Sequence, residues 1–216
     1  MHSAPISRLF AGVLANVCMV GWCEAAQPVS TVATIHFANP TPEQAANAAG
    51  ILQARFAELQ PSYFSTVAAA ASGKKVVLEF RGEAPSDDAI REYATQGVFR
   101  IHAIDTPLVF LVTDYDVQTV QARQDGDVVV LALTVNESAG QRLKNHTSRN
   151  PGGILVTSWN GKEQSKSRIS GVFSQQFQST GMDRETAIRM MIMLRTGRLP
   201  AAPNKIEIVH PSGKPG

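Results

Sequence analysis

Apolar and polar residues along this chain follow two periods, and each change of period marks the boundary of a predicted element. Alternating or continuously apolar stretches of strand length predict strands at 31–37, 74–81, 98–104, 127–135, 154–159, 162–173, 175–178 and 204–210. Helical spacing or composition predicts helices at 42–60, 87–96, 137–150 and 183–196. The order of these elements predicts an α+β fold.

Several element ends carry specific signals. Thr41, Pro42 and Gln44 have the spacing of a capping box with proline at the first helical position. Asn160-Gly161 lies between two strand patterns and predicts a tight hairpin. The strand at 127–135 is apolar on both of its alternating sides, which predicts burial on both faces.

The first 26 residues have the pattern of a secretory signal peptide. A weakly basic start precedes an apolar core at 9–22, which is shorter than the roughly 20 residues that a membrane span needs. Small residues at 23–26 suit cleavage. An uncleaved membrane anchor and a lipoprotein are the alternatives. Cleavage predicts a periplasmic protein, whereas an uncleaved segment predicts a protein anchored to the inner membrane.

Both cysteines, Cys18 and Cys23, lie inside this segment. The mature chain would therefore contain none. This excludes a disulfide scaffold, a thiol nucleophile and a thiolate metal site.

Charge divides the chain into two unlike halves, although the net charge is only +2. The range 27–136 has seven basic and twelve acidic residues, a net charge of −5. The range 137–198 has ten basic and four acidic residues, a net charge of +6. Solubility and mutual attraction of the halves explain this division. Alternatively, the basic half meets an acidic polypeptide, an anionic lipid surface or an acidic partner.

The second half also contains a series of motifs in one order. They are Leu133-Thr134-Val135, the pair Thr147 and Asn150, Ile154-Leu155-Val156, Asn160-Gly161-Lys162, Ile169-Ser170-Gly171-Val172, Met182-Asp183-Arg184-Glu185-Thr186-Ala187, and Met193-Leu194-Arg195-Thr196-Gly197-Arg198-Leu199-Pro200. This order resembles the head subdomain of the first periplasmic domain of SecD, the membrane-integrated helper of the bacterial Sec translocase. The order of elements in the first half resembles the base subdomain of the same domain.

The resemblance implies a ferredoxin-like base lobe with an inserted α+β head lobe. The expected organisation is a signal peptide at 1–26, a base at 27–112 with 204–210 as a returning strand, a head at 113–203 and a tail at 211–216. Within it, 105–127 would link the halves. The glycine-rich Asp-Leu-x-Gly-Gly segment that precedes the SecD base has no counterpart before Ala38.

The resemblance further implies contact with polypeptide or with the Sec export machinery. SecD moves its head by means of proton flow through membrane helices, and no stretch of the mature chain is apolar enough to provide one. The implied role is therefore passive binding. An adaptor that docks on one folded envelope protein and an unrecognised envelope hydrolase are the alternatives.

Residues that could support catalysis are present without a recognisable spacing. The chain has no HxxxH, HExxH or GxSxG motif, and no glycine loop that opens a helix. Asp114 and Asp116 suit a hard cation but lack the glycine and distant glutamate of a calcium loop, so a solvated loop is the simpler interpretation. We expect no catalytic site, no metal, no cofactor and no nucleic-acid partner.

The hairpin around Asn160 is the best candidate binding feature. Trp159 precedes the turn, and Lys162, Lys166 and Arg168 fall on one face of the following strand by its period of two. A strand this polar is expected at a sheet edge, where it can pair with an extended chain. An ordinary solvated hairpin is the alternative.

Overall fold

The computed structural model describes residues 29–59, 66–126 and 128–211. The predicted signal peptide, both cysteines and the tail beyond Pro211 lie outside this part of the chain. In chain order, the elements are β1 (Val29–Phe37), α1 (Pro42–Glu58), β2 (Thr66–Ser72), β3 (Lys75–Arg81), α2 (Asp87–Tyr93), β4 (Phe99–Ala103), β5 (Phe110–Thr113), η1 (Asp114–Asp116), β6 (Val117–Asp125), β7 (Val128–Val135), α3 (Glu137–Arg149), β8 (Ile154–Trp159), β9 (Lys162–Arg168), β10 (Gln176–Ser179), α4 (Arg184–Thr196) and β11 (Pro203–Val209). The predicted α+β class is confirmed, with three antiparallel sheets.

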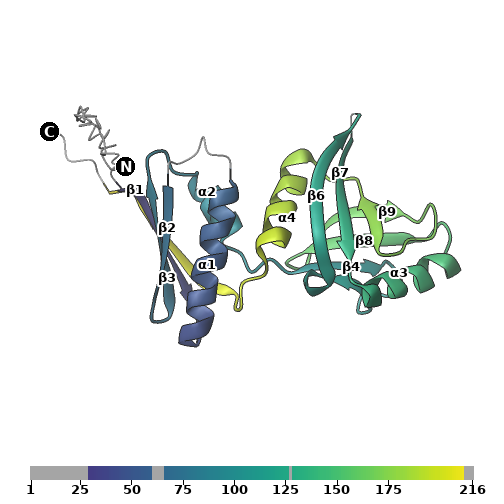
Figure 1. Ribbon diagram of the computed structural model, residues 1–216, viewed down its shortest axis with the longest axis horizontal. Coiled ribbons are helices and arrows are strands. Elements are labelled where there is room, and N and C mark those ends of the chain that lie inside the picture. Colours follow the sequence, from purple (N-terminus) through teal and green to yellow (C-terminus); the bar gives the residue numbers. More distant parts are fainter. Residues whose placement is uncertain (1–28, 60–65, 127, 212–216) are drawn as a thin grey trace, which may run out of the picture.

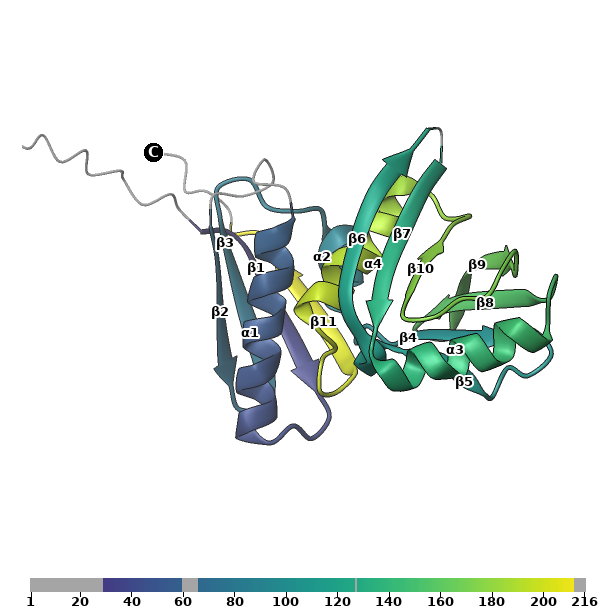
Figure 2. The same cartoon turned by 45° about the vertical axis from the view of Figure 1, so that its right-hand side comes forward.

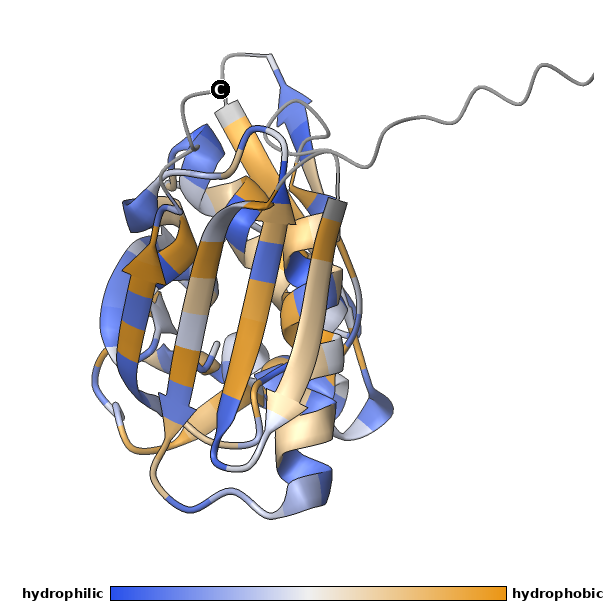
Figure 3. Ribbon diagram, turned by 90° about the vertical axis from the view of Figure 1, so that its left-hand side faces the viewer, coloured by the Kyte–Doolittle hydropathy of each residue, from blue (hydrophilic) through white to orange (hydrophobic). Residues whose placement is uncertain are grey.

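The first lobe, residues 29–97 and 203–211, contains a four-stranded sheet in the order β11-β1-β3-β2. Helices α1 and α2 cover one face of this sheet, and the other face is open (Figures 1 and 3). Ile35, Leu78 and Phe80 point from the sheet into the covered side and are fully buried. Phe56 of α1 meets Phe80 edge to face, with 5.2 Å between the ring centroids. Burial of these apolar side chains fixes the helix on the sheet.

The start of α1 confirms the capping box. Thr41 Oγ1 accepts a hydrogen bond from the Gln44 amide at 3.1 Å, and Gln44 Oε1 accepts one from the Thr41 amide at 2.9 Å. Pro42 occupies the first helical position, where an amide hydrogen has no partner in the helix. The local sequence therefore sets where this helix begins.

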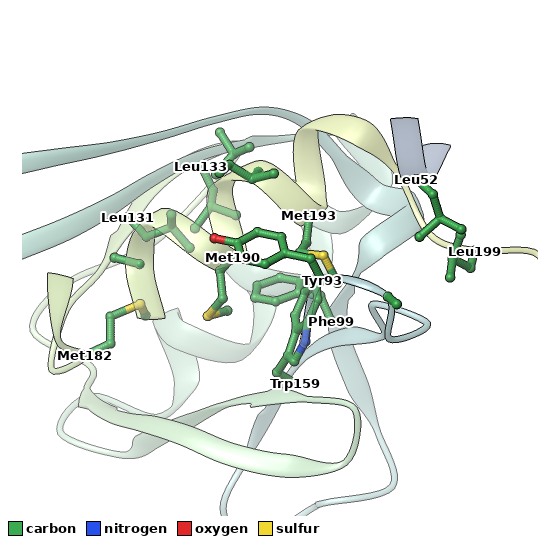
Figure 4. Packing of buried hydrophobic residues seen from close by; sticks show 14 of the residues in the cluster. Leu52, Tyr93, Phe99, Leu131, Leu133, Trp159, Met182, Met190, Met193 and Leu199 are labelled. Carbon is green, nitrogen blue, oxygen red and sulfur yellow. The ribbon is translucent and has the colours of Figure 1, made fainter. Parts of the chain in front are cut away.

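The second lobe, residues 98–202, contains the sheets β10-β7-β6 and β5-β4-β8-β9 together with α3 and α4 (Figures 1 and 2). The inner faces of the sheets meet α4 in one apolar core (Figure 4). Labelled side chains from β4, β7, β8 and α4 converge there: Phe99, Leu131, Leu133, Trp159, Met190 and Met193. Met190 and Met193 are therefore core residues.

The strand predicted at 98–104 and the apolar residues at 108–112, both inside the expected base at 27–112, pair with strands of the second lobe. β4 pairs with β5 and with β8, so the strand at 98–104 and the apolar run at 108–112 lie in the sheet of the hairpin. Phe99 and Ile101 bury their side chains in the core of that lobe. Sequence order suggested otherwise because these strands follow directly on the first lobe.

The segment expected to link the halves also contains β6, which pairs with β7 along its length. Its only fully buried side chain is Val120, so its pattern looks like that of a polar loop. The prediction that β7 is buried on both faces is met only in part. Leu131, Leu133 and Val135 are buried on the core side, whereas on the other side Val130 is buried and Ala132 and Thr134 are half-buried.

The chain returns to the first lobe through β11. This strand pairs with β1 in an antiparallel register that runs from the pair Val32 and Val209 to the pair Phe37 and Pro203.

The net charge of each lobe follows from this division of the strands. It is −2 for 27–97 with 203–211 and +3 for 98–202. The contrast in charge is thus smaller than the contiguous division of the sequence suggested.

Helix α4 lies between the lobes and belongs to both (Figure 1). Its Arg195 forms an ion pair with Glu58 of α1 at 3.2 Å, and its Arg189 pairs with Glu92 of α2. Leu199, just after the helix, is fully buried in the same apolar cluster as Leu52 of α1 (Figure 4). The two lobes therefore share one continuous core.

Candidate binding surface

Trp159 does not lie on the surface. It stands opposite Phe99 across β8 and β4, and only 7% of its side chain is exposed. Its ring packs toward Met193 in the core of the second lobe (Figure 4). Its position in the strand turns Trp159 to the inner face of the sheet, and the ligand contact expected for it stays a prediction.

Asn160 and Gly161 form the predicted hairpin turn, with φ angles of 48° and 80°. Both angles suit a primed turn, which explains the residue types. Asn160 Oδ1 accepts hydrogen bonds from the amides of Gly97 and Val98, at 3.1 and 2.9 Å. Asn160 therefore anchors the hairpin to the connection between the lobes, and its amide is used inside the fold.

Lys162 does not share a face with Lys166 and Arg168. The β8–β9 register shifts between Thr157 and Ser158, which leaves Gln164 as an extra residue on β9. This β-bulge reverses the alternation. Lys162 consequently stands opposite the inward-facing Trp159, and the prediction of one shared face was wrong.

Lys166 and Arg168 do lie together on the outer face of the sheet, where both are exposed. They stand opposite Val156 and Ile154. Lys166 Nζ lies 3.0 Å from Glu163, an exposed pair that contributes little stability. Lys162 is exposed as well, near the turn, but Lys166 and Arg168 are the two predicted cations that share the outer face.

The predicted edge position of β9 is correct, since the sheet order ends with β9. Ile169, just beyond the strand, bonds inward to Gly152 and Gly153 through both its amide and its carbonyl. By alternation, the backbone groups of Lys166 and Arg168 point away from β8. The turn at Gly181 approaches this edge, because a Cβ built there would lie 3.9 Å from the Lys166 carbonyl oxygen. The open edge is therefore short.

A cleft of about 440 Å³ lies where the hairpin turn meets the first lobe. Asn160, Gly161 and Arg100 line one side, and Ala94 and Ile206 line the other. Its lining is mainly apolar, and Arg100 is its titratable side chain. The cleft can accept an apolar side chain but offers no pair of groups for acid–base chemistry.

Arg55, an arginine of the helix that resembles one in the SecD base, was given no functional role from the sequence, and it is completely buried. Its Nη1 donates to the carbonyls of Tyr93 and Thr95, at 2.8 and 2.6 Å. Its Nη2 donates to those of Gln96 and Gly197, at 3.3 and 2.7 Å. Burial lowers the pKa of the guanidinium to about 9. The signal available in the sequence for its burial was a charged residue placed among the apolar residues of α1 that face the sheet.

The four carbonyls that Arg55 binds come from both connections between the lobes. Residues 93–96 lead out of the first lobe, and Gly197 leads back toward it. Gly97 has a φ of 86°, and a Cβ there would lie 2.9 Å from Arg55 Nη2, so glycine is required for the close approach. Arg55 thus fixes how the two chain crossings run side by side.

Protein groups occupy the carboxylate of Asp116, whereas Asp114 Oδ2 is buried and accepts no hydrogen bond. Burial alone would raise the pKa of Asp116, but hydrogen bonds from Thr113, Arg142 and Asn136 outweigh it and lower the pKa. Burial raises the pKa of Asp114, whose Oδ2 lies 3.8 Å from Arg198. Across the described residues, no group of three potential metal ligands occurs.

Among the helices of the described residues, none has the length and apolarity needed to cross a membrane.

These features define a class of protein: a two-lobed α+β chain with one shared core, an exposed basic strand and a clasped connection between the lobes. Solved structures of SecDF have the same fold. One, titled "Crystal structure of SecDF in Super-membrane-facing form", matches 87% of this chain with a TM-score of 0.67 and 16% identity. The chain covers only 31% of that SecDF chain.

A second structure, titled "Structure and function of a membrane component SecDF that enhances protein export", is covered completely. It matches 85% of this chain with a TM-score of 0.64 and 16% identity. No protein-family model matches the sequence, and no curated protein matches it. The resemblance to the SecDF periplasmic domain is therefore confirmed at the level of the fold.

Proposed function

We propose that this chain is a passive polypeptide-binding module of the periplasm that works beside the protein-export machinery. The observation that carries the proposal is the shared fold with SecDF, described as a membrane component that enhances protein export. A chain exported by the predicted signal peptide would meet emerging polypeptides in that compartment. The proposed act is binding, with no energy input.

The proposal includes a ferredoxin-like base for the first lobe. Its elements follow the order β-α-β-β-α-β, with the second lobe inserted before the last strand. The strand order β11-β1-β3-β2 and the antiparallel pairing support this assignment. The insertion explains why the base is discontinuous in sequence.

The proposed binding element is the outer edge of β9. Unpaired backbone groups at a sheet edge can hydrogen-bond to an extended chain in any sequence. Lys166 and Arg168 stand beside that edge and attract acidic segments. Because the open edge is short, we expect weak and sequence-tolerant binding, which suits transient contact with unfolded chains.

The test is the affinity of the full chain for a permanently unfolded protein, measured by fluorescence anisotropy at low and high salt. Reversing both charges, Lys166→Glu with Arg168→Glu, should weaken binding by at least about tenfold, because attraction becomes repulsion. The matched control is Lys74→Glu with Lys205→Glu, which changes the net charge equally on the first lobe and should leave binding unchanged. Equal loss in both variants would overturn the assignment to β9.

The alternatives give different results in a crosslinking experiment. Because Trp159 is buried, the photoreactive group belongs at Arg168, and it is activated in intact cells. Many nascent or unfolded chains in the crosslinked products support the proposal. One folded envelope protein as the single product indicates an adaptor. Turnover of an envelope substrate, without crosslinks to polypeptide, would indicate a hydrolase.

A further inference from the structure

The turn between β4 and β5 exposes an unusual amount of apolar surface. Leu108 is 88% exposed, Val109 59% and Ile104 47%. Hydrogen bonds from Thr106 to Ala103 and from Val109 to Thr106 fix the backbone of this turn. Figure 2 shows it at the end of the second lobe that points away from the first lobe. A turn with a fixed backbone and apolar side chains at its tip is suited to insertion into an apolar environment outside the protein.

This tip continues into the outer face of the sheet β5-β4-β8-β9. The Ile104 amide donates to the Ile154 carbonyl at 3.0 Å, and Ile154 stands opposite Arg168. The next row contains His102 and Phe110, followed by Val156 and Lys166 on the neighbouring strands. The register therefore places Ile154 and Phe110, both half-buried, on this face above the buried Val156, with two cations along its far strand.

A third cation completes the basic rim of this face. The Arg100 guanidinium lies 4.2 Å from the centroid of the Phe110 ring. Three acids lie nearby: Glu163, which is paired with Lys166, Asp105 in the turn, and Asp114, which interacts with Arg198 and Arg100. With Arg198 included, four cations stand against three acids, so the face carries a small positive charge beside its apolar tip.

We infer that this face and its turn form a docking surface for an anionic lipid bilayer. Leu108 and Val109 enter the boundary between headgroups and acyl chains, while Arg100, Lys166 and Arg168 bind lipid phosphates. Charge complementarity and a protruding apolar tip are the combination that holds peripheral proteins on membranes. A pocket of about 380 Å³ lies on this face, between Ile154, Lys166 and Arg168. Lys166 and Arg168 are shared with the proposed polypeptide site at the β9 edge, whereas Leu108 and Val109 lie outside that site.

The experiment measures sedimentation of the full chain with vesicles of phosphatidylglycerol and phosphatidylethanolamine, and with vesicles of phosphatidylcholine. The apparent affinity for the anionic vesicles should fall about tenfold in Leu108→Ser and about fivefold for each charge removed in Lys166→Gln and Arg168→Gln. Val209→Ser is the matched control, because Val209 is 58% exposed on the first lobe. It should bind like the unaltered chain.

A fluorescent, environment-sensitive amino acid at position 108 or 209 shows which surface meets the lipid, independently of the amino-terminal segment. Its emission should shift to the blue on anionic vesicles at position 108 and stay constant at position 209. No shift at 108, or equal shifts at both positions, overturns the inference. A shift at 108 on unfolded protein but not on vesicles assigns the face to polypeptide instead.

Leu108→Ser separates this inference from the proposed function. The substitution lies outside β9, so binding of unfolded protein should persist while vesicle binding falls. Thermal unfolding of each variant checks that the fold is retained. Loss of vesicle binding by a folded Leu108→Ser protein that still binds polypeptide supports the lipid surface.

Discussion

Asp116 shows at the scale of one residue how a carboxylate holds a corner of the second lobe. Its Oδ2 accepts hydrogen bonds from the Thr113 amide at 2.8 Å and from Arg142 Nη2 at 2.7 Å, and its Oδ1 accepts one from Asn136 at 3.0 Å. Asn136 also caps α3. One side chain thereby joins η1, the start of α3 and the body of that helix.

The pH dependence of stability tests this network. The folded-state pKa of Asp116 is lower than its usual value of 3.8. Its stabilising contribution is therefore complete above that value and is lost as the pH falls through the folded-state pKa. Asp116→Asn should lower the free energy of unfolding by about 1–3 kcal/mol at neutral pH, because the network loses its charged acceptor.

Urea unfolding at neutral and strongly acidic pH provides the measurement. The difference between Asp116→Asn and the unaltered chain should shrink in acid, where both carry a neutral side chain. Asp105→Asn, an exposed carboxylate outside the network, is the control and should change little at either pH. A difference that is independent of pH would contradict an ionic role for Asp116.

Single residues also show where prediction from the sequence ends. The caps at Thr41 and the turn at Asn160-Gly161 depend on neighbours a few positions away, so they could be predicted. The burial of Trp159 and of Arg55 depends on strands and carbonyls distant in sequence. Those contacts leave no local pattern, so the exposed position expected for Trp159 could not be checked from the sequence.

At the scale of elements, β9 depends on one extra residue. Gln164 has no counterpart on β8, and residues on either side of it keep their pairing with Ser158 and Thr157. Deleting Gln164 should leave Glu163 opposite Ser158 and Ser165 opposite Thr157. The deletion therefore removes a bulge without turning Lys166 and Arg168 to the other face.

We expect the Gln164 deletion to fold with a free energy of unfolding within about 1 kcal/mol of the unaltered chain. Inserting one residue between Ser165 and Lys166 should be far more harmful, because it turns both cations toward the core. Thermal unfolding by circular dichroism compares the two variants. A deletion as destabilising as the insertion would show that the assigned register is wrong.

Strands with one strongly apolar side were predictable as elements, whereas β6 and β2 were not. β6 buries few of its side chains, and β2 is an alanine-rich edge strand. Sheet membership was harder still. β4 has the same alternation whether it pairs with β3 or β8, so only the three-dimensional contacts of Phe99 and Ile101 decide the sheet.

At the scale of the whole molecule, α4 and Arg55 make the two lobes one cooperative unit. The lobes meet through a shared apolar core and through two ion pairs that α4 forms with α1 and α2. This arrangement supports the simpler reading of the charge division, in which the lobes attract each other. The chain leaves the first lobe and returns to it beside this shared core, so the lobes need no second contact surface to hold them together.

Removal of the Arg55 guanidinium should weaken the coupling between the two lobes. Arg55→Met keeps the apolar stem but leaves carbonyls of both connections without donors, so we expect a loss of about 3–5 kcal/mol in the free energy of unfolding. Arg195→Gln breaks an exposed ion pair at the same junction and should cost less than about 1 kcal/mol.

Hydrogen exchange at residues 93–97 should accelerate in Arg55→Met but not in Arg195→Gln. Calorimetry should show one transition for the unaltered chain and a broadened or divided transition for Arg55→Met, because each lobe retains its own sheet but loses the clasp between them. Equal behaviour of the two variants would mean that the apolar core alone holds the lobes together.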